Sequence, residues 1–137
     1  MNGKGITAKL GVLRDNLARL AELPQATYAE FAADFRTIDS ALHRLQTSIQ
    51  ALVDIGSYKL GRRGLPPPDT SRDILVVLER DGAIPSGTAE RFAPLFAFRN
   101  RVVHLYDRVD PQRVYEILTT HRQDLATLLD LLLGIPD

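Results

Sequence analysis

The most regular pattern of apolar positions in the chain lies between residues 28 and 52. Its apolar residues alternate steps of three and four, as in a helix with a single apolar stripe: Tyr28, Phe31, Phe35, Ile38, Leu42, Leu45, Ile49 and Leu52. At ~1.5 Å per residue, such a helix is roughly 37 Å long. The stripe fits the core of a four-helix bundle, which needs no partner, or an interface between two subunits.

Four other stretches have helical spacing of apolar residues. Residues 6–23 carry Leu10, Leu13, Leu17 and Leu20, and a short helix after Asp69 or Thr70 carries Ile74, Leu75, Val77 and Leu78. A helix from Ser86 or Thr88 to Tyr106 carries Phe92, Leu95, Phe96, Phe98, Val102 and Val103. The last helix carries Val114, Ile117, Leu118, Leu125, Leu128, Leu129 and Leu132. We expect all of these apolar residues to face the core.

Capping residues and turn formers mark the ends of these helices. Thr27 with Glu30 forms a capping box, Gly82 stops the short helix, and Asp110 with Pro111 opens the last helix. Pro94 lies in the first two turns of its helix or marks a later start. Residues 56–68, with three glycines and three prolines, are expected to form one exposed connection.

No segment alternates apolar and polar residues over a useful length, and no repeat of fixed period is present. The sequence therefore predicts an all-α fold, an up-down helical bundle of about five helices. At 137 residues, the chain 1–137 fits a single domain.

Charge restricts the partners that the chain can have. The 17 Lys and Arg residues balance the 17 Asp and Glu residues, so the chain lacks the basic excess of a non-specific nucleic-acid binder. Residues 59–113 nevertheless hold 10 basic and 7 acidic residues, so an RNA site would have to be local. Lys59, Arg62, Arg63 and Arg101 are candidate RNA contacts, although such charges also serve to solvate a loop.

Several classes of protein are excluded or disfavoured by composition. The chain has no Cys, which removes disulfide scaffolds and Cys-ligated zinc, and its three histidines, His43, His104 and His121, lack ligand spacing, so we expect no metal site. No apolar run approaches the ~20 residues of a membrane span, and no signal peptide is recognisable at the start. We expect a cytoplasmic protein that does not bind membranes.

Candidate chemistry is concentrated in residues 99–106, with the sequence RNRVVHLY. Arg99 is a fixed cation whose fork matches phosphate oxygens, and His104 can take up or release a proton near neutral pH. Together they suit RNA cleavage by the 2′-OH, with His104 in acid/base catalysis, Arg99 stabilising the charge on phosphorus and Asn100 in a supporting role, orienting His104 or the phosphate. Alternatively, His104 is a core residue bonded to a backbone carbonyl.

Helical geometry separates the two main residues, because Arg99 and His104 point about 140° apart on a regular helix. Three arrangements would bring them together. The helix could unwind near His104, the Arg99 side chain could curl round, or two subunits could pool their motifs across a shared cleft.

The stretch resembles the HEPN superfamily, and within it the HepT-like toxins with the signature Arg-x4-His-x-Tyr. The resemblance extends over Gly64-Leu65-Pro66, Gly82-Ala83-Ile84, Phe98-Arg99-Asn100, Val103-His104 and Tyr106. It implies a dimeric helical bundle with facing motifs and metal-independent endoribonuclease activity that needs no cofactor. The RNA would be tRNA or mRNA.

The same resemblance implies a partner and a modification. The chain would be the toxin of a toxin-antitoxin pair, and an MntA-type nucleotidyltransferase antitoxin would silence it by attaching AMP to Tyr106, within a homodimer or a larger hetero-oligomer. Two other functions stay open at this point. One is a non-catalytic HEPN module that binds substrate for a nucleotidyltransferase, and the other is a purely structural dimeric bundle.

Overall fold

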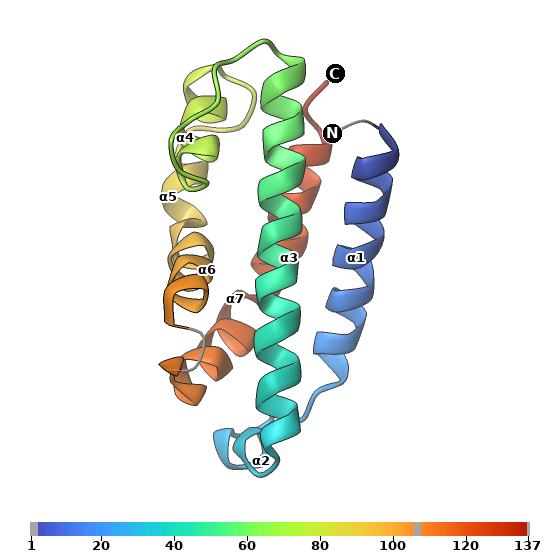
Figure 1. Cartoon of the computed structure of the whole chain (residues 1–137), viewed down its shortest axis with the longest axis vertical. Helices are drawn as coiled ribbons and strands as arrows, with labels where there is room; N and C mark the ends of the chain where they lie inside the picture. Colours follow the sequence, from blue (N-terminus) through green and yellow to red (C-terminus); the bar gives the residue numbers. More distant parts are fainter. Residues whose placement is uncertain (1–2, 106–107, 137) are drawn as a thin grey trace.

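The computed structural model describes residues 3–105 and 108–136, and these residues form seven helices and no strand. The all-α prediction is confirmed. The helices are α1 (Gly3–Glu22), α2 (Tyr28–Ala32), α3 (Phe35–Arg62), α4 (Asp73–Arg80), α5 (Thr88–Arg91), α6 (Ala93–Leu105) and α7 (Pro111–Leu133). The long helices α1, α3 and α7 run along the length of the molecule, and α4, α5 and α6 follow one another in a column beside α3 (Figure 1).

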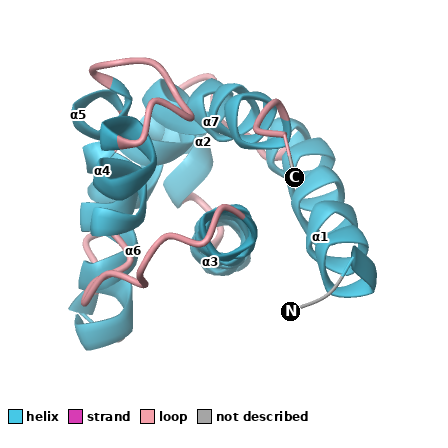
Figure 2. Ribbon diagram, turned by 90° about the horizontal axis from the view of Figure 1, so that it is seen from above, coloured by secondary structure: helices cyan, strands magenta, loops and turns pink. Residues whose placement is uncertain are grey.

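Helix α3 is the central element of the bundle. It packs against α1, α2, α4, α6 and α7, and the other helices form an arc around it with α1 at one end and α6 at the other (Figure 2). Leu45, Ile49 and Ile55 of α3 are completely buried. Every apolar residue of the last helix that was predicted to face inward is buried in α7.

The described residues form more helices than the five predicted, because two predicted helices are each divided in two. The first division falls at Asp34, whose carboxylate accepts a hydrogen bond from the Arg36 backbone N–H at 2.9 Å and caps α3. The Arg36 side chain, with that backbone bond, holds the pKa of Asp34 below its ordinary value. The second division falls between Arg91 and Ala93, so Pro94 marks a later start.

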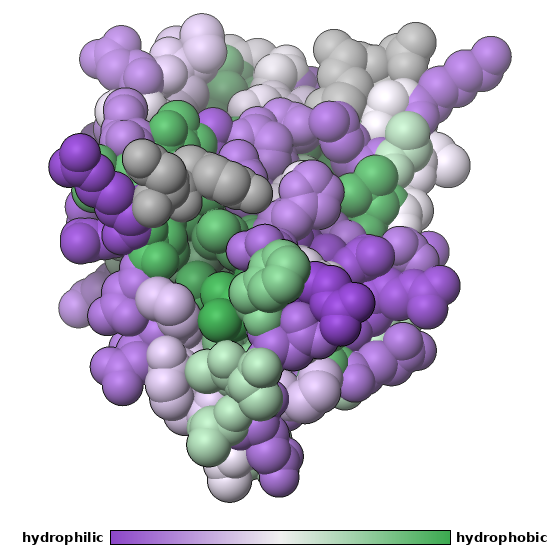
Figure 3. Space-filling view, turned by 60° about the horizontal axis from the view of Figure 1, so that its bottom comes forward, coloured by the Kyte–Doolittle hydropathy of each residue, from purple (hydrophilic) through white to green (hydrophobic). Residues whose placement is uncertain are grey.

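Two residues that were predicted to face the core are exposed instead. Phe35 is 70% exposed and Val103 is 49% exposed. Leu105, two residues after Val103 on α6, is also exposed, at 37%. Figure 3, which brings the α2 end of the molecule forward, shows hydrophobic residues gathered on this face. Phe35, Val103 and Leu105 are thus apolar side chains that the chain leaves exposed to solvent.

The prediction of an irregular connection over residues 56–68 is wrong in its first half, because α3 continues to Arg62. Gly56 is a packing residue within α3: a Cβ at this position would lie 2.9 Å from Ile74 Cγ2 of α4. The absence of a side chain thus lets α4 approach α3 closely.

The predicted caps agree with the structure at three places and fail at one. Thr27 accepts a hydrogen bond from the Glu30 N–H, and Asp110 caps α7 before Pro111. Gly82 stops α4 with a φ of +80°. The predicted cap of α4 at Asp69 or Thr70 is wrong, since the helix begins at Asp73 and has no side-chain cap.

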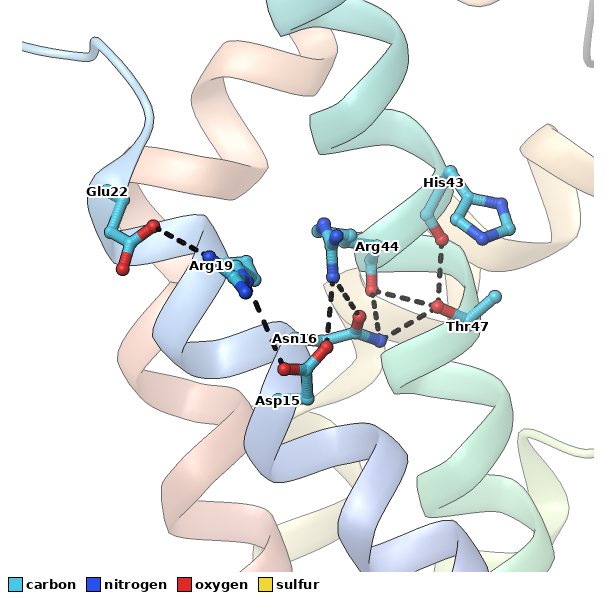
Figure 4. A network of polar contacts seen from close by, with 7 residues as sticks. All are labelled: Asp15, Asn16, Arg19, Glu22, His43, Arg44 and Thr47. Atoms are coloured by element: carbon cyan, nitrogen blue, oxygen red, sulfur yellow. Dashed lines mark hydrogen bonds and ion pairs between the residues drawn. The ribbon is translucent and has the colours of Figure 1, made fainter.

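A buried asparagine joins α1 to α3 (Figure 4). Asn16 is 5% exposed, and its Nδ2 donates to Thr47 Oγ1 at 2.8 Å and to the Arg44 carbonyl oxygen at 3.2 Å. Arg44 Nη1 donates to Asn16 Oδ1 at 3.1 Å. Because a buried amide is costly without these partners, the contact fixes the register of α1 on α3.

No helix in the described part of the chain is both long enough and apolar enough to span a membrane.

Candidate active site

Helix α6 presents the motif by burying its apolar residues. Leu95, Phe98 and Val102 face the core, which leaves Arg99 and Asn100 half-buried and His104 exposed. The interpretation of His104 as a core histidine is therefore wrong, and its imidazole is accessible to a substrate.

The Arg99 guanidinium reaches from α6 to α3. Its Nε and Nη2 donate to Gln50 Oε1 at 3.2 and 2.7 Å, and its Nη1 donates to Asn100 Oδ1 at 3.2 Å. Gln50 Nε2 in turn donates to Asp54 Oδ1 at 3.0 Å, and Asp54 Oδ2 forms an ion pair of 2.9 Å with Lys9 Nζ of α1. A polar network thus connects three helices and ends at the motif arginine.

Sequence reasoning missed Gln50, Asp54 and Lys9. Gln50 and Asp54 are four residues apart, a spacing that places them on one polar face of a helix, but it does not identify the residue they meet. Gln50 lies 49 positions from Arg99, so only the packing of α3 against α6 brings the pair together.

Two of the three arrangements proposed for Arg99 and His104 do not occur in one protomer. Helix α6 is regular through Leu105, so it does not unwind at His104. Arg99 is extended to Gln50 and Asn100 instead of curling towards His104. Because they are five positions apart on a regular helix, the side chains point about 140° apart. One protomer therefore presents its arginine and its histidine on different faces.

Three of the basic residues predicted as RNA contacts lie at the end of α3, and the fourth, Arg101, lies on α6. Lys59 is 8% exposed and its Nζ donates to the Ile135 carbonyl oxygen at 2.8 Å, so the prediction of an exposed cation there is wrong. Arg63 Nε donates to Asp81 Oδ2 at 2.7 Å. Arg62 is exposed beside an open hollow of about 450 Å³, and Arg101 is exposed on α6.

The remaining residues to place are Tyr106 and the other two histidines. Tyr106 lies outside the described residues. His43 is exposed on α3, and His121 Nδ1 lies 2.9 Å from Asp124 Oδ2 on α7, which agrees with a structural role for His121. Among residues 3–105 and 108–136, no three His, Asp or Glu side chains lie close enough together to hold a metal ion.

The chain is similar in sequence to known ribonucleases. Residues 13–132 match the family model described as ribonuclease HepT-like. The mRNA nuclease HepT of Shewanella oneidensis is 25% identical over 104 residues, which are 76% of this chain and 78% of that protein. The tRNA nuclease HepT of Aphanizomenon flos-aquae is 24% identical over 110 residues, 80% of this chain and 75% of that protein.

Solved structures share the fold. The tri-AMPylated HEPN toxin of Shewanella oneidensis, in complex with the MNT antitoxin, superposes with a TM-score of 0.82 at 23% identity and covers 98% of this chain and 99% of that one. A toxin-antitoxin complex with AMP-PNP gives a TM-score of 0.80 at 23% identity, covering 96% and 99% of the two chains. The family match extends over most of the chain, and the chain belongs to the family of HepT-like ribonucleases.

Proposed function

We propose that this chain is a metal-independent endoribonuclease toxin in which Arg99 binds the scissile phosphate and His104 transfers protons. The observation that carries the assignment of Arg99 is the chemistry of its partners. Two neutral amide oxygens hold the guanidinium, and no carboxylate contacts it in the described part of the chain. Its positive charge is thus available to an anion. The similar proteins named mRNA nuclease and tRNA nuclease support RNA as that anion.

The proposed reaction uses the 2′-OH of RNA as the nucleophile. An imidazole takes the 2′-OH proton, the 2′ oxygen attacks phosphorus, and the bond to the 5′ oxygen breaks as that oxygen receives a proton. Arg99 stabilises the negative charge that gathers on the phosphoryl oxygens during this step. Asn100 supports Arg99, since its Oδ1 accepts from Nη1. The products are a 2′,3′-cyclic phosphate and a 5′-OH.

We propose that two protomers form a two-fold dimer in which the motifs face each other. Arg99 and His104 diverge within one protomer, so a second protomer would supply the missing face. Val103 and Leu105, which flank His104, are 49% and 37% exposed, an arrangement suited to burial against a partner.

A nucleotidyltransferase antitoxin of the MntA type is proposed as the second partner. Similar structures contain a toxin with an MNT antitoxin, and the Shewanella oneidensis toxin is tri-AMPylated. In this chain the proposed acceptor is Tyr106, whose phenol oxygen would attack the α-phosphate of ATP and release pyrophosphate. An added anion two residues from His104 would repel the RNA phosphate. We expect this regulation to take place in the cytoplasm, in a homodimer or a larger hetero-oligomer.

Cleavage of RNA in the presence of EDTA tests the proposed reaction. Purified protein should generate 2′,3′-cyclic phosphate ends, and Arg99→Ala or His104→Ala should lower the rate by at least about 10². Strict dependence on added metal, or full activity of His104→Ala, would reject the mechanism. RNA binding by the wild type without cleavage would favour the non-catalytic module instead.

Intact mass spectrometry tests the proposed modification. After co-expression with the antitoxin, the wild type should carry one or more adenylyl groups and Tyr106→Phe should carry none. Persistence of the mass increase in Tyr106→Phe would move the modification to another residue.

A further inference from the structure

Gln50 determines how the Arg99 guanidinium is held. Its single carbonyl oxygen accepts from both Nε and Nη2 of Arg99, at 3.2 and 2.7 Å. A guanidinium has five N–H groups in a fixed fork. Gln50 and Asn100 together occupy three of them, so one N–H on each Nη stays available for a substrate oxygen.

Asp54 and Lys9 determine how Gln50 is held. Gln50 Nε2 donates to Asp54 Oδ1 at 3.0 Å. The opposite orientation of the amide would set its carbonyl oxygen against the Asp54 carboxylate and its NH₂ group against Arg99, so the network selects one orientation. The Lys9 ammonium, 2.9 Å from Asp54 Oδ2, balances the charge of this carboxylate.

The charges of the network leave one cation unbalanced. Lys9 and Asp54 cancel each other, Gln50 and Asn100 are neutral, and Arg99 contributes one positive charge. A glutamate at position 50 would have nearly the same shape as glutamine, but it would pair with Arg99 and compete with phosphate. The amide therefore orients the guanidinium without neutralising it.

We propose that Gln50 is a positioning residue of the ribonuclease site, which holds Arg99 as an uncompensated cation aimed at the RNA phosphate, and that Asp54 with Lys9 fixes the orientation of Gln50. This inference rests on the proposed binding of phosphate by Arg99. It assigns to α3 a part of the site that lies outside the sequence motif on α6.

The test compares Gln50→Glu with Gln46→Glu. Both substitutions add one negative charge to the same face of α3, one turn apart, but Gln46 has no hydrogen bond to Arg99. Binding is measured by fluorescence anisotropy with a 2′-O-methyl RNA oligonucleotide, which cannot be cleaved through a 2′-OH, over a series of salt concentrations. Thermal unfolding verifies that each variant is folded.

Gln50→Glu should weaken RNA binding about tenfold. The association constant should also fall less steeply with salt, with the slope of log K against log[salt] reduced in magnitude by about one, as for the loss of one phosphate contact. Gln46→Glu should change affinity less than threefold. In an Arg99→Ala background, Gln50→Glu should cause no further loss, because the two residues act as one unit. A structural role of Gln50 would give additive effects and an unchanged slope.

The result that overturns the inference is a folded Gln50→Glu variant that binds RNA like the wild type, or one whose loss persists unchanged in the Arg99→Ala background. Cleavage of unmodified RNA by the same proteins distinguishes this outcome from failure of the proposed function. If the wild type binds RNA and does not cleave it, while Gln50→Glu weakens binding as expected, the ribonuclease activity is rejected and the positioning of Arg99 by Gln50 stands.

Discussion

Replacing Val103 by glutamate should dissociate the proposed dimer and abolish RNA cleavage while leaving the protomer folded. Val103 is 49% exposed, so about half of its side chain remains to be buried by a partner. Full burial of a valine contributes about 1.5 kcal/mol, which gives roughly 0.7 kcal/mol for each protomer. A glutamate there would also place an unpaired carboxylate in an apolar interface, at a cost of several kcal/mol.

Two-fold symmetry doubles these effects, so with about 3 kcal/mol for each carboxylate the dimer should weaken by about 7 kcal/mol, roughly 10⁵-fold in dissociation constant. Molar mass is measured by light scattering over a dilution series, together with the rate of RNA cleavage. Val12→Glu is the matched control, because Val12 is 44% exposed on α1, on the other side of α3 from α6 (Figure 1). A dimeric Val103→Glu, or a monomeric variant with full activity, would refute the two-subunit site.

Three further substitutions test the packing that supports the site. Asn16→Ala removes three hydrogen bonds between α1 and α3, and it should lower the free energy of unfolding in urea by about 2 kcal/mol; an unchanged midpoint would mean that the network contributes nothing. Ser48→Ala should leave the free energy of unfolding unchanged or raise it by up to about 1 kcal/mol, because the buried Ser48 hydroxyl has no hydrogen-bond partner among the described residues. A clear loss of stability in the same urea titration would contradict this. Gly56→Val should lower the stability by about 1–3 kcal/mol through overlap with Ile74, whereas Gly61→Val, where a Cβ meets nothing within 4 Å, should cost less in a parallel thermal melt.

The fold could be predicted where the apolar spacing and the capping residues agree. They agree at Thr27 and Asp110, and the predicted starts of the two helices that these residues open are correct, since α2 begins at Tyr28 and α7 at Pro111. They disagree at Asp34, where the apolar spacing continues across a residue that caps a new helix. Periodicity alone therefore predicted one helix, and it placed the exposed Phe35 in the core.

The candidate site was predictable only in the part that is contiguous in sequence. Arg99 and His104 share a motif, whereas Gln50 is brought to Arg99 by the register of α3 against α6, which no local pattern encodes. The prediction that Lys59 is an exposed RNA contact failed for a different reason. Lys59 was grouped with its basic neighbours in a loop, but α3 continues past it and its position follows the buried Ile55 by one helical turn.

The register of α1 on α3 links the stability of the bundle to the motif on α6. Asn16 of α1 contacts Thr47 of α3, and Lys9 of α1 contacts Asp54 of α3. The second contact lies seven residues before the first in α1 and seven residues after it in α3, because the two helices are antiparallel. Two contacts that are two turns apart in the same antiparallel register cannot shift independently. Asp54 also accepts from Gln50, and Gln50 accepts from Arg99, so a displacement of α1 along α3 would separate Lys9 from the carboxylate that holds the Gln50 amide. We therefore expect the buried asparagine to support the proposed phosphate binding indirectly, by fixing the pairing that keeps Lys9 beside Asp54.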